Sequence, residues 1–166
     1  MEIIDDLLPK NEFKDIKDFM EGPSCPWFFN DCKVSEGDGD FQFTHTFLEL
    51  TDGYIEDAVS QTSGWLNIWD NVIKKIESKK CIRIKANLTL KTFEHRPSLY
   101  HIDYPNLKTA VFYVNNNNGY TEFENGVKIK SVANRICIFD SNLKHRGVTH
   151  TKDGYQRIVV NFNYER

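Results

Sequence analysis

The sequence has few of the features that mark secreted or membrane-bound proteins. Its four cysteines are scattered and include no Cys-x-x-Cys pair, so we expect unpaired thiols in a reducing compartment rather than a disulfide framework. Acidic residues interrupt the apolar run at the N-terminus, which is the wrong composition for a signal peptide or a membrane anchor. We therefore expect a cytoplasmic protein without a membrane partner.

A strongly basic face is also lacking. The chain carries 21 Lys and Arg against 24 Asp and Glu, a formal net charge of −3, which does not favour a nucleic-acid partner. With 166 residues, 40% of them hydrophobic, the chain is long enough to bury one core. The sequence predicts a single domain over residues 1–166, with no second module.

The hydrophobic pattern divides the chain into two parts. Residues 1–80 are mixed: a helix over 12–20, a strand over 41–47, and a longer helix over 63–78 whose apolar positions recur at helical spacing. From 81 to 164 the period changes to two, and short strands alternate with Asn, Gly, Asp and Pro signals. The fold class is predicted to be α+β, a double-stranded β-helix or jelly roll over 81–164 with supporting helices from 1–80. The expected strands cover residues 81–90, 98–103, 109–115, 119–123, 127–131, 136–139 and 157–164.

A candidate metal site begins at His101-Ile102-Asp103. On a strand, residues two apart point to the same face, so the imidazole and the carboxylate can reach one ion. Alone, the triplet is also explained by chance, or by Asp103 forming a turn before Pro105. His145 follows the apolar strand 136–139 and can supply a third ligand from a neighbouring strand. Two histidines and one carboxylate leave coordination positions open, as ferrous iron needs, whereas structural zinc needs a fourth ligand, usually sulfur.

Arg157 begins the last apolar strand. Alternation places it on the face opposite Ile158, Val160 and Phe162, so a buried guanidinium there needs an anion, and a dicarboxylic acid can supply two parallel hydrogen bonds. The alternative is an arginine at the strand edge in solvent.

These residues resemble a known family in their order. The chain contains, in order, a His-x-Asp motif, a Tyr-Val-Asn strand, Gly-x-Thr-x-Phe, a strand ending in Phe-Asp, a histidine and then an arginine. This order resembles the 2-oxoglutarate- and iron(II)-dependent oxygenases. Within that superfamily the chain is most similar to the prolyl-4-hydroxylase-like branch, in small versions from bacteria and their viruses. The cytoplasm of a host cell is then the expected compartment if a phage encodes the chain.

The resemblance implies a site residue by residue. Iron(II) would be held by His101, Asp103 and His145, and 2-oxoglutarate by Arg157, with dioxygen as the second co-substrate and ascorbate as a supporting reductant. The residues expected to contact 2-oxoglutarate are Tyr113, Asn87, Thr109 and Thr121. Each of these four has an ordinary alternative: a core tyrosine, a turn-side amide or a strand-forming threonine.

The resemblance also indicates a substrate. It implies hydroxylation of an unactivated C–H bond, in this branch a prolyl residue in a protein or peptide. Asn163 stands where the nucleic-acid demethylases carry a second arginine, which counts against a nucleobase. Two alternatives stay open: a free amino acid or other small molecule as substrate, and a cupin-like binding module without catalysis.

Two further parts of the sequence each allow two interpretations. His150 is an alternative to His145 as the third metal ligand, but only His145 directly follows the Phe139-Asp140 strand end. The tract Asn115–Gly119 tolerates positive φ and is either a lid over the site or a hairpin turn.

Overall fold

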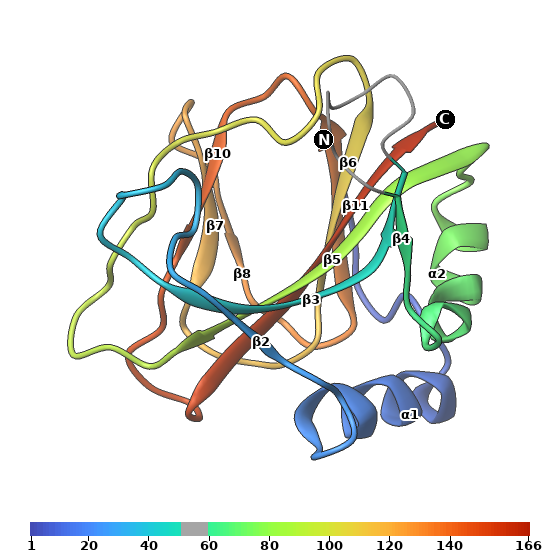
Figure 1. Ribbon diagram of the computed structural model, residues 1–166, viewed down its shortest axis with the longest axis horizontal. Helices are drawn as coiled ribbons and strands as arrows, with labels where there is room; N and C mark the ends of the chain where they lie inside the picture. Colours follow the sequence, from blue (N-terminus) through green and yellow to red (C-terminus); the bar gives the residue numbers. More distant parts are fainter. Residues whose placement is uncertain (51–59) are drawn as a thin grey trace.

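The computed structural model describes residues 1–50 and 60–166, and in that part the chain folds into two antiparallel sheets with helices on one side. The large sheet has the order β1-β9-β6-β11-β5-β3-β2, with β4 paired to β3, and the small sheet has the order β10-β7-β8 (Figure 1). The strands of the large sheet are β1 (Glu2–Ile4), β2 (Phe28–Asn30), β3 (Gln42–Glu49), β4 (Gln61–Thr62), β5 (Lys80–Leu90), β6 (Lys108–Tyr113), β9 (Arg135–Asp140) and β11 (Gln156–Glu165). Those of the small sheet are β7 (Tyr120–Phe123), β8 (Lys128–Lys130) and β10 (His145–Val148). The predicted jelly roll with supporting helices is confirmed.

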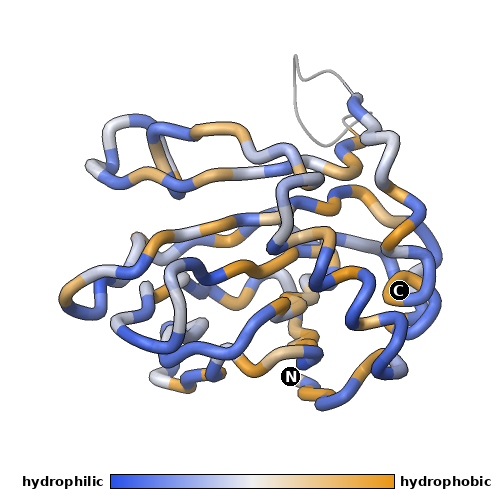
Figure 2. The backbone as a smooth tube through the Cα atoms, turned by 90° about the horizontal axis from the view of Figure 1, so that it is seen from below, coloured by the Kyte–Doolittle hydropathy of each residue, from blue (hydrophilic) through white to orange (hydrophobic). Residues whose placement is uncertain are grey.

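Alternation along β11 explains how the large sheet separates two environments. Ile158, Val160 and Phe162 are fully buried on the outer face, where they pack in one cluster with helix residues such as Trp69 and Met20. The residues that alternate with these three point to the inner face, toward the small sheet: Arg157, Val159, Asn161 and Asn163. Along the strands, the tube in Figure 2 switches repeatedly between hydrophobic and hydrophilic colours, as this arrangement requires.

The helices cover the outer face. Helix α1 (Lys10–Glu21) buries Ile16 and Met20, which are one turn apart. The next residue is Gly22, where a Cβ atom would lie 2.5 Å from the Asp18 carbonyl oxygen. The predicted helix over 63–78 is shorter than expected: a 3₁₀ turn, η1 (Leu66–Trp69), leads into α2 (Asp70–Lys75). Glu77, with φ of 55°, stops the helix by adopting a left-handed conformation. Of the apolar positions in this segment, Trp69, Val72 and Ile76 are inaccessible to solvent, whereas Trp65 is exposed.

No helix in the described residues is long and apolar enough to cross a membrane.

Candidate functional site

Three potential metal ligands meet between the two sheets. His101 and Asp103 lie in the segment between β5 and β6, and His145 begins β10. The segment containing Asp103 is not the strand that the sequence predicted: His101 forms an isolated bridge with His145, in which each backbone N–H donates to the other's carbonyl at 3.0 Å. This reciprocal pair, rather than alternation along one strand, fixes the ligands relative to one another.

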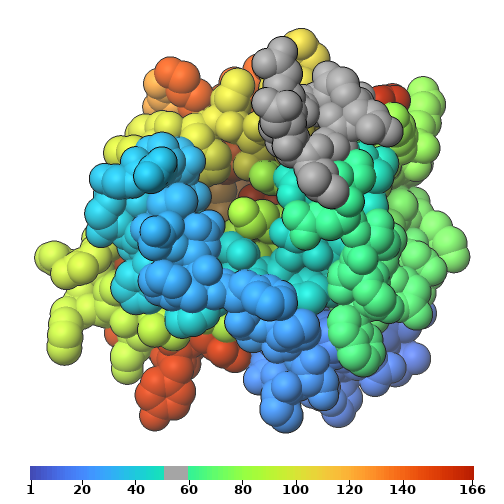
Figure 3. Space-filling view, viewed as in Figure 1, coloured from blue at the N-terminus to red at the C-terminus, as the bar shows by residue number. Residues whose placement is uncertain are grey.

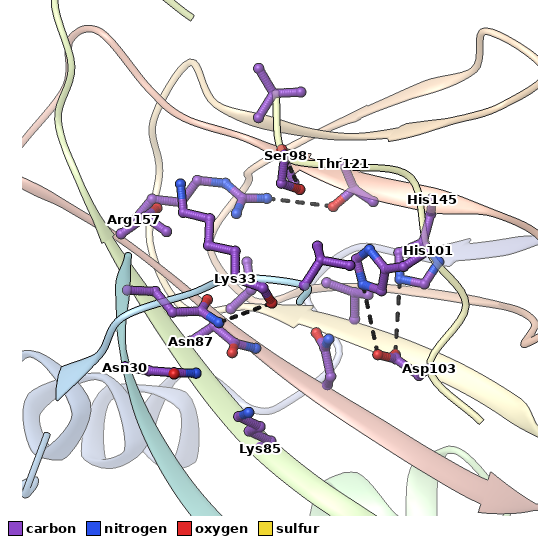
Figure 4. Close-up of a pocket in the computed structure, with 18 of the residues that line it drawn as sticks. Asn30, Lys33, Lys85, Asn87, Ser98, His101, Asp103, Thr121, His145 and Arg157 are labelled. Carbon is purple, nitrogen blue, oxygen red and sulfur yellow. Dashed lines mark hydrogen bonds and ion pairs between the residues drawn. The ribbon is translucent and has the colours of Figure 1, made fainter. Parts of the chain in front are cut away.

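The donor atoms are close enough to share one ion. His101 Nε2 lies 3.8 Å from Asp103 Oδ1, His145 Nε2 lies 3.9 Å from Asp103 Oδ2, and all three donors lie within 4.8 Å of one another (Figure 4). The Nδ1 atom of each histidine lies 3.2 Å from a backbone carbonyl, of Leu99 and Leu143 respectively. These carbonyls favour the tautomer with a proton on Nδ1, which leaves each Nε2 free to bind a metal.

The electrostatics of the cluster also suit a cation. Within the described part of the chain His145 Nε2 is buried without a hydrogen-bond partner, and burial lowers the pKa of this imidazole. Burial raises the pKa of Asp103, but Arg83 and the two histidines outweigh it and lower that pKa to about 2. An anionic carboxylate beside two imidazoles, one of them with an orphaned buried nitrogen, fits a divalent ion such as iron(II).

A polar network behind Asp103 was not foreseen from the sequence. Arg83 on β5 donates from Nη2 to Asp103 Oδ1 at 2.7 Å, and its Nε donates to Asn163 Oδ1 at 3.0 Å. Asn163 in turn donates to Asp103 Oδ2 at 3.3 Å and to Thr109 Oγ1 at 3.0 Å. Asn163 therefore helps to hold the Asp103 carboxylate. The sequence had indicated only that this residue is not the arginine of the nucleic-acid demethylases.

Thr109 lies away from the co-substrate end expected for it. It is paired in register with Asn163, six residues along β11 from Arg157, and it does not line the cavity. Thr109 and Tyr113 are four residues apart on β6, and the sequence could not show which residue of β11 each would pair with. The contact of Thr109 with Asn163 places it behind the metal cluster.

Arg157 is buried on the inner face of β11, with 4% of its surface exposed. Its Nε donates to Ser131 Oγ at 2.9 Å and its Nη2 to Thr121 Oγ1 at 3.4 Å, but within the described residues no carboxylate pairs with it. Burial lowers the pKa of this guanidinium, so its charge is destabilised where it lies. An unpaired buried cation of this kind fits a dicarboxylic acid.

The surroundings of Arg157 are closely packed. Tyr113 Oη donates to Thr121 Oγ1 at 2.8 Å, and the Tyr113 ring centroid lies 5.9 Å from Arg157 Cζ. A Cβ atom on Gly119 would lie 2.7 Å from Arg157 Cδ and 2.8 Å from Asn117 Oδ1. Glycine is therefore needed at 119 for the close approach of Arg157, although its φ is not positive.

One cavity joins the two ends of the site. It has a volume of about 420 Å³, and the metal cluster and Arg157 both line it, together with Asn87 and Thr121. Tyr113 does not line it and reaches it only through Thr121. In Figure 3 the surface is hollowed near the centre of the view, beside the blue residues that precede β3. Further lining residues that the sequence did not single out are Asn30, Lys33, Gln42, Arg83, Lys85, Ser98 and Asn161.

The Asn-rich tract is not a hairpin turn. It connects β6 of the large sheet to β7 of the small sheet, and none of its residues has positive φ. Asn115 and Asn117 are buried; Asn115 donates to the Gln156 carbonyl at 3.0 Å and accepts from the Ile158 N–H at 3.1 Å. These bonds fix the crossing between the sheets, because asparagine side chains satisfy backbone groups that no ladder pairs.

His150 lies beyond β10 and is fully buried. Within the described residues, the cluster of potential ligands contains His145 and not His150.

Comparison with solved structures identifies the fold. A 2OG-Fe(II) oxygenase family oxidoreductase from Burkholderia pseudomallei superimposes with a TM-score of 0.69 at 10% identity, over 98% of this chain and 84% of that one. The chain has the fold of the 2-oxoglutarate- and iron(II)-dependent oxygenases.

Two prolyl hydroxylases have the same oxygenase fold. One is the viral collagen prolyl hydroxylase of Paramecium Bursaria Chlorella virus-1, solved as a 2OG complex, with a TM-score of 0.62, 15% identity and coverage of 98% and 93%. The other is a Trichoplax adhaerens prolyl hydroxylase, solved with a peptide fragment of hypoxia inducible factor, with a TM-score of 0.66, 13% identity and coverage of 99% and 82%. No family model and no curated protein sequence matches the chain.

Proposed function

We propose that the chain is an iron(II)- and 2-oxoglutarate-dependent oxygenase that hydroxylates an unactivated C–H bond. The observation that carries this proposal is the pairing, in one cavity, of a His-Asp-His cluster with a buried arginine that has no carboxylate partner in the described residues. A cupin-like module that only binds a metal or a sugar has no need of Arg157. The oxygenase accounts for both features at once.

In this proposal His101, Asp103 and His145 hold iron(II), and their partners keep them in place. The backbone carbonyls of Leu99 and Leu143 orient the two imidazoles, while Arg83 and Asn163 orient the carboxylate. When bound, iron(II) and 2-oxoglutarate together activate dioxygen, and oxidative decarboxylation to succinate and carbon dioxide supplies the oxidising power for hydroxylation.

Arg157 binds the distal carboxylate of 2-oxoglutarate. Its Nε is held by Ser131, and Thr121, which already accepts hydrogen bonds from Tyr113 and Arg157, lines the same part of the cavity. Asn87 lies two residues from Thr89, the register partner of Arg157, and lines the cavity as a further polar contact. The enclosing walls exclude water from this salt bridge, which strengthens it.

We propose a prolyl residue in a protein or peptide as the substrate. Support comes from the sequence resemblance and from the shared fold of two prolyl hydroxylases. A free amino acid or another small molecule is the alternative. Incubating the iron-loaded protein with proline-containing peptides, free proline and methylated oligonucleotides, and measuring masses, tests the choice: addition of one oxygen atom to a peptide supports the prolyl residue, and demethylation alone contradicts it.

The co-substrate role of Arg157 has its own test. Arg157→Ala is expected to raise the KM for 2-oxoglutarate strongly, because a buried bidentate pair worth about 2–5 kcal/mol is lost, while bound iron is unchanged. Succinate formation gives the KM and metal analysis gives the iron content. Equal KM values for the wild type and Arg157→Ala would contradict the assignment.

A further inference from the structure

The inner face of the large sheet is arranged in rows that run across the strands. In register, Arg157 of β11 faces Thr89 of β5, then Val159 faces Asn87, Asn161 faces Lys85, and Asn163 faces Arg83. The first of these rows is the co-substrate end and the last is the metal end. Lys85 lies one row from Arg83, roughly 6.5 Å along the strand, and its register partner Asn161 lies roughly 13 Å along β11 from Arg157.

In the part of the chain that the structure describes, Lys85 is a cation that forms no ion pair. Its side chain lines the cavity, and within the described residues it has neither an ion pair nor a hydrogen bond. Burial lowers the pKa of this ammonium group and Arg83 lowers it further, while Glu49 and Asp103 act in the opposite direction without contacting it. An anion that entered the cavity would relieve both destabilising effects.

The other cations of the cavity are accounted for. Arg83 is paired with Asp103 at 2.7 Å, and Lys33 is paired with Asp40 at 2.5 Å. Arg157 is separated from Lys85 by the row of Asn87 and Val159, and it is assigned to the distal carboxylate of the co-substrate. Lys85 therefore remains for a second anionic group.

Two neutral amide side chains lie beside Lys85. Asn161 faces it across β11 and Asn87 follows it on the same face of β5, and both amides line the cavity. In Figure 4 the side chains of Asn87, Asn30 and Lys85 are drawn below Arg157, His101 and His145 in the view. An ammonium group beside amide N–H donors is a suitable site for a carboxylate.

We propose that Lys85, with Asn161, binds a carboxylate of the substrate and so selects an anionic substrate for the metal centre. This inference rests on the proposed oxygenase function and specifies its substrate class. The carboxylate belongs either to a free amino acid or to an acidic residue beside the hydroxylated one in a peptide.

Matched ligand pairs distinguish these two sources. The protein, loaded with Mn(II) and 2-oxoglutarate without oxygen, is titrated calorimetrically with L-proline and L-prolinamide, and with blocked dipeptides in which proline follows glutamate or glutamine. In at least one pair the carboxylate member is expected to bind about tenfold more tightly, the size of one charge-assisted hydrogen bond. The pair that shows the preference identifies the source of the carboxylate.

Substitutions then assign the preference to Lys85. Lys85→Met is expected to reduce it to less than about twofold, and Lys85→Arg to retain most of it. Lys33→Met is the matched control, since its ammonium group lines the same cavity but is already paired with Asp40. A second readout uses the wild type alone: acylation of Lys85 by an amine-reactive reagent, followed by peptide mass spectrometry, should slow with the preferred carboxylate ligand and not with its amide.

Two results would overturn the inference. One is the absence of a carboxylate preference in both pairs, or a preference that Lys85→Met leaves intact. The other is a Lys85→Met variant that loses affinity for 2-oxoglutarate alone, because Lys85 would then serve the co-substrate. Failure of Mn(II) and 2-oxoglutarate to bind the wild type, with the carboxylate preference intact, would instead contradict the proposed oxygenase function and leave the Lys85 site standing.

Discussion

Arg83 and Asp103 form an ion pair of 2.7 Å between the middle of β5 and the loop that carries two of the three potential metal ligands. Their side chains are 15% and 7% exposed, so water screens the pair little. The pair compensates the buried carboxylate in the absence of a metal ion, and it holds one of its oxygen atoms in a fixed direction.

Arg83→Met should therefore destabilise the metal-free protein. Removal of one partner from a buried pair costs about 3–5 kcal/mol, because the remaining charge is left uncompensated. A divalent ion supplies the missing positive charge, so the increase in Tm on adding Mn(II) should be larger in Arg83→Met than in the wild type. Thermal unfolding with and without Mn(II) measures both effects.

Arg166→Met serves as the control, because its pair with Glu77 is exposed and should contribute little. An Arg83→Met variant with wild-type stability, or with the same Mn(II)-induced rise in Tm, would show that the ion pair does not compensate Asp103.

Gly119→Ala should weaken co-substrate binding although residue 119 is not itself proposed to touch 2-oxoglutarate. The added methyl group would lie 2.7 Å from Arg157 Cδ, and Arg157 or the loop must shift. We expect a higher KM for 2-oxoglutarate and a destabilisation of about 1–3 kcal/mol. Gly147→Ala is the matched control, since its Cβ would lie 3.9 Å from Arg157 Nη1, an ordinary contact. Equal KM values for the two variants would contradict the packing argument.

His150 should make the metal-free protein less stable in mild acid. Burial lowers the pKa of its imidazole below the usual 6.5, so the unfolded chain takes up the proton first as the pH falls. Its contribution to stability is complete above pH 6.5 and is lost progressively as the pH falls toward the lowered pKa. His145 acts in the same direction, since burial lowers its pKa as well.

His150→Gln should accordingly reduce the fall in Tm between about pH 7.5 and pH 5.5, measured with a chelator present. It should not abolish the fall, because His145 remains. An unchanged fall in His150→Gln would mean that this histidine does not contribute to the acid sensitivity.

Alternation made much of the inner face predictable. It placed Arg157 opposite Ile158, Val160 and Phe162, as the structure does. The same alternation on β5 puts Arg83, Lys85, Asn87 and Thr89 on one face. Because Asn87 was expected to point into the site, the sequence could also have placed Arg83 and Lys85 on the inner face. The alternation pattern does not show where the loop that carries Asp103 lies. Nothing in the sequence around Arg83 indicates that Asp103, twenty residues later, forms a hydrogen bond with it.

Register and loop conformation were not predictable from local pattern. Thr109 was expected beside the co-substrate, but the pairing of β6 with β11 sets it against Asn163. His101 and Asp103 were expected on a strand, and instead the backbone pairing of His101 with His145 places them. Both outcomes depend on contacts between segments far apart in the chain, which single-strand periodicity does not contain.

The central claim is that one metal ion and one 2-oxo acid bind together at this site, and anaerobic titration with iron(II) and 2-oxoglutarate tests it most directly. Chelation of iron(II) by the keto and carboxylate oxygens should give a weak visible charge-transfer band in the wild type and in His150→Ala. The band should be absent in His101→Ala, Asp103→Ala and His145→Ala. A band of wild-type strength in those three variants, or its loss in His150→Ala with retention in His145→Ala, would contradict the assigned site.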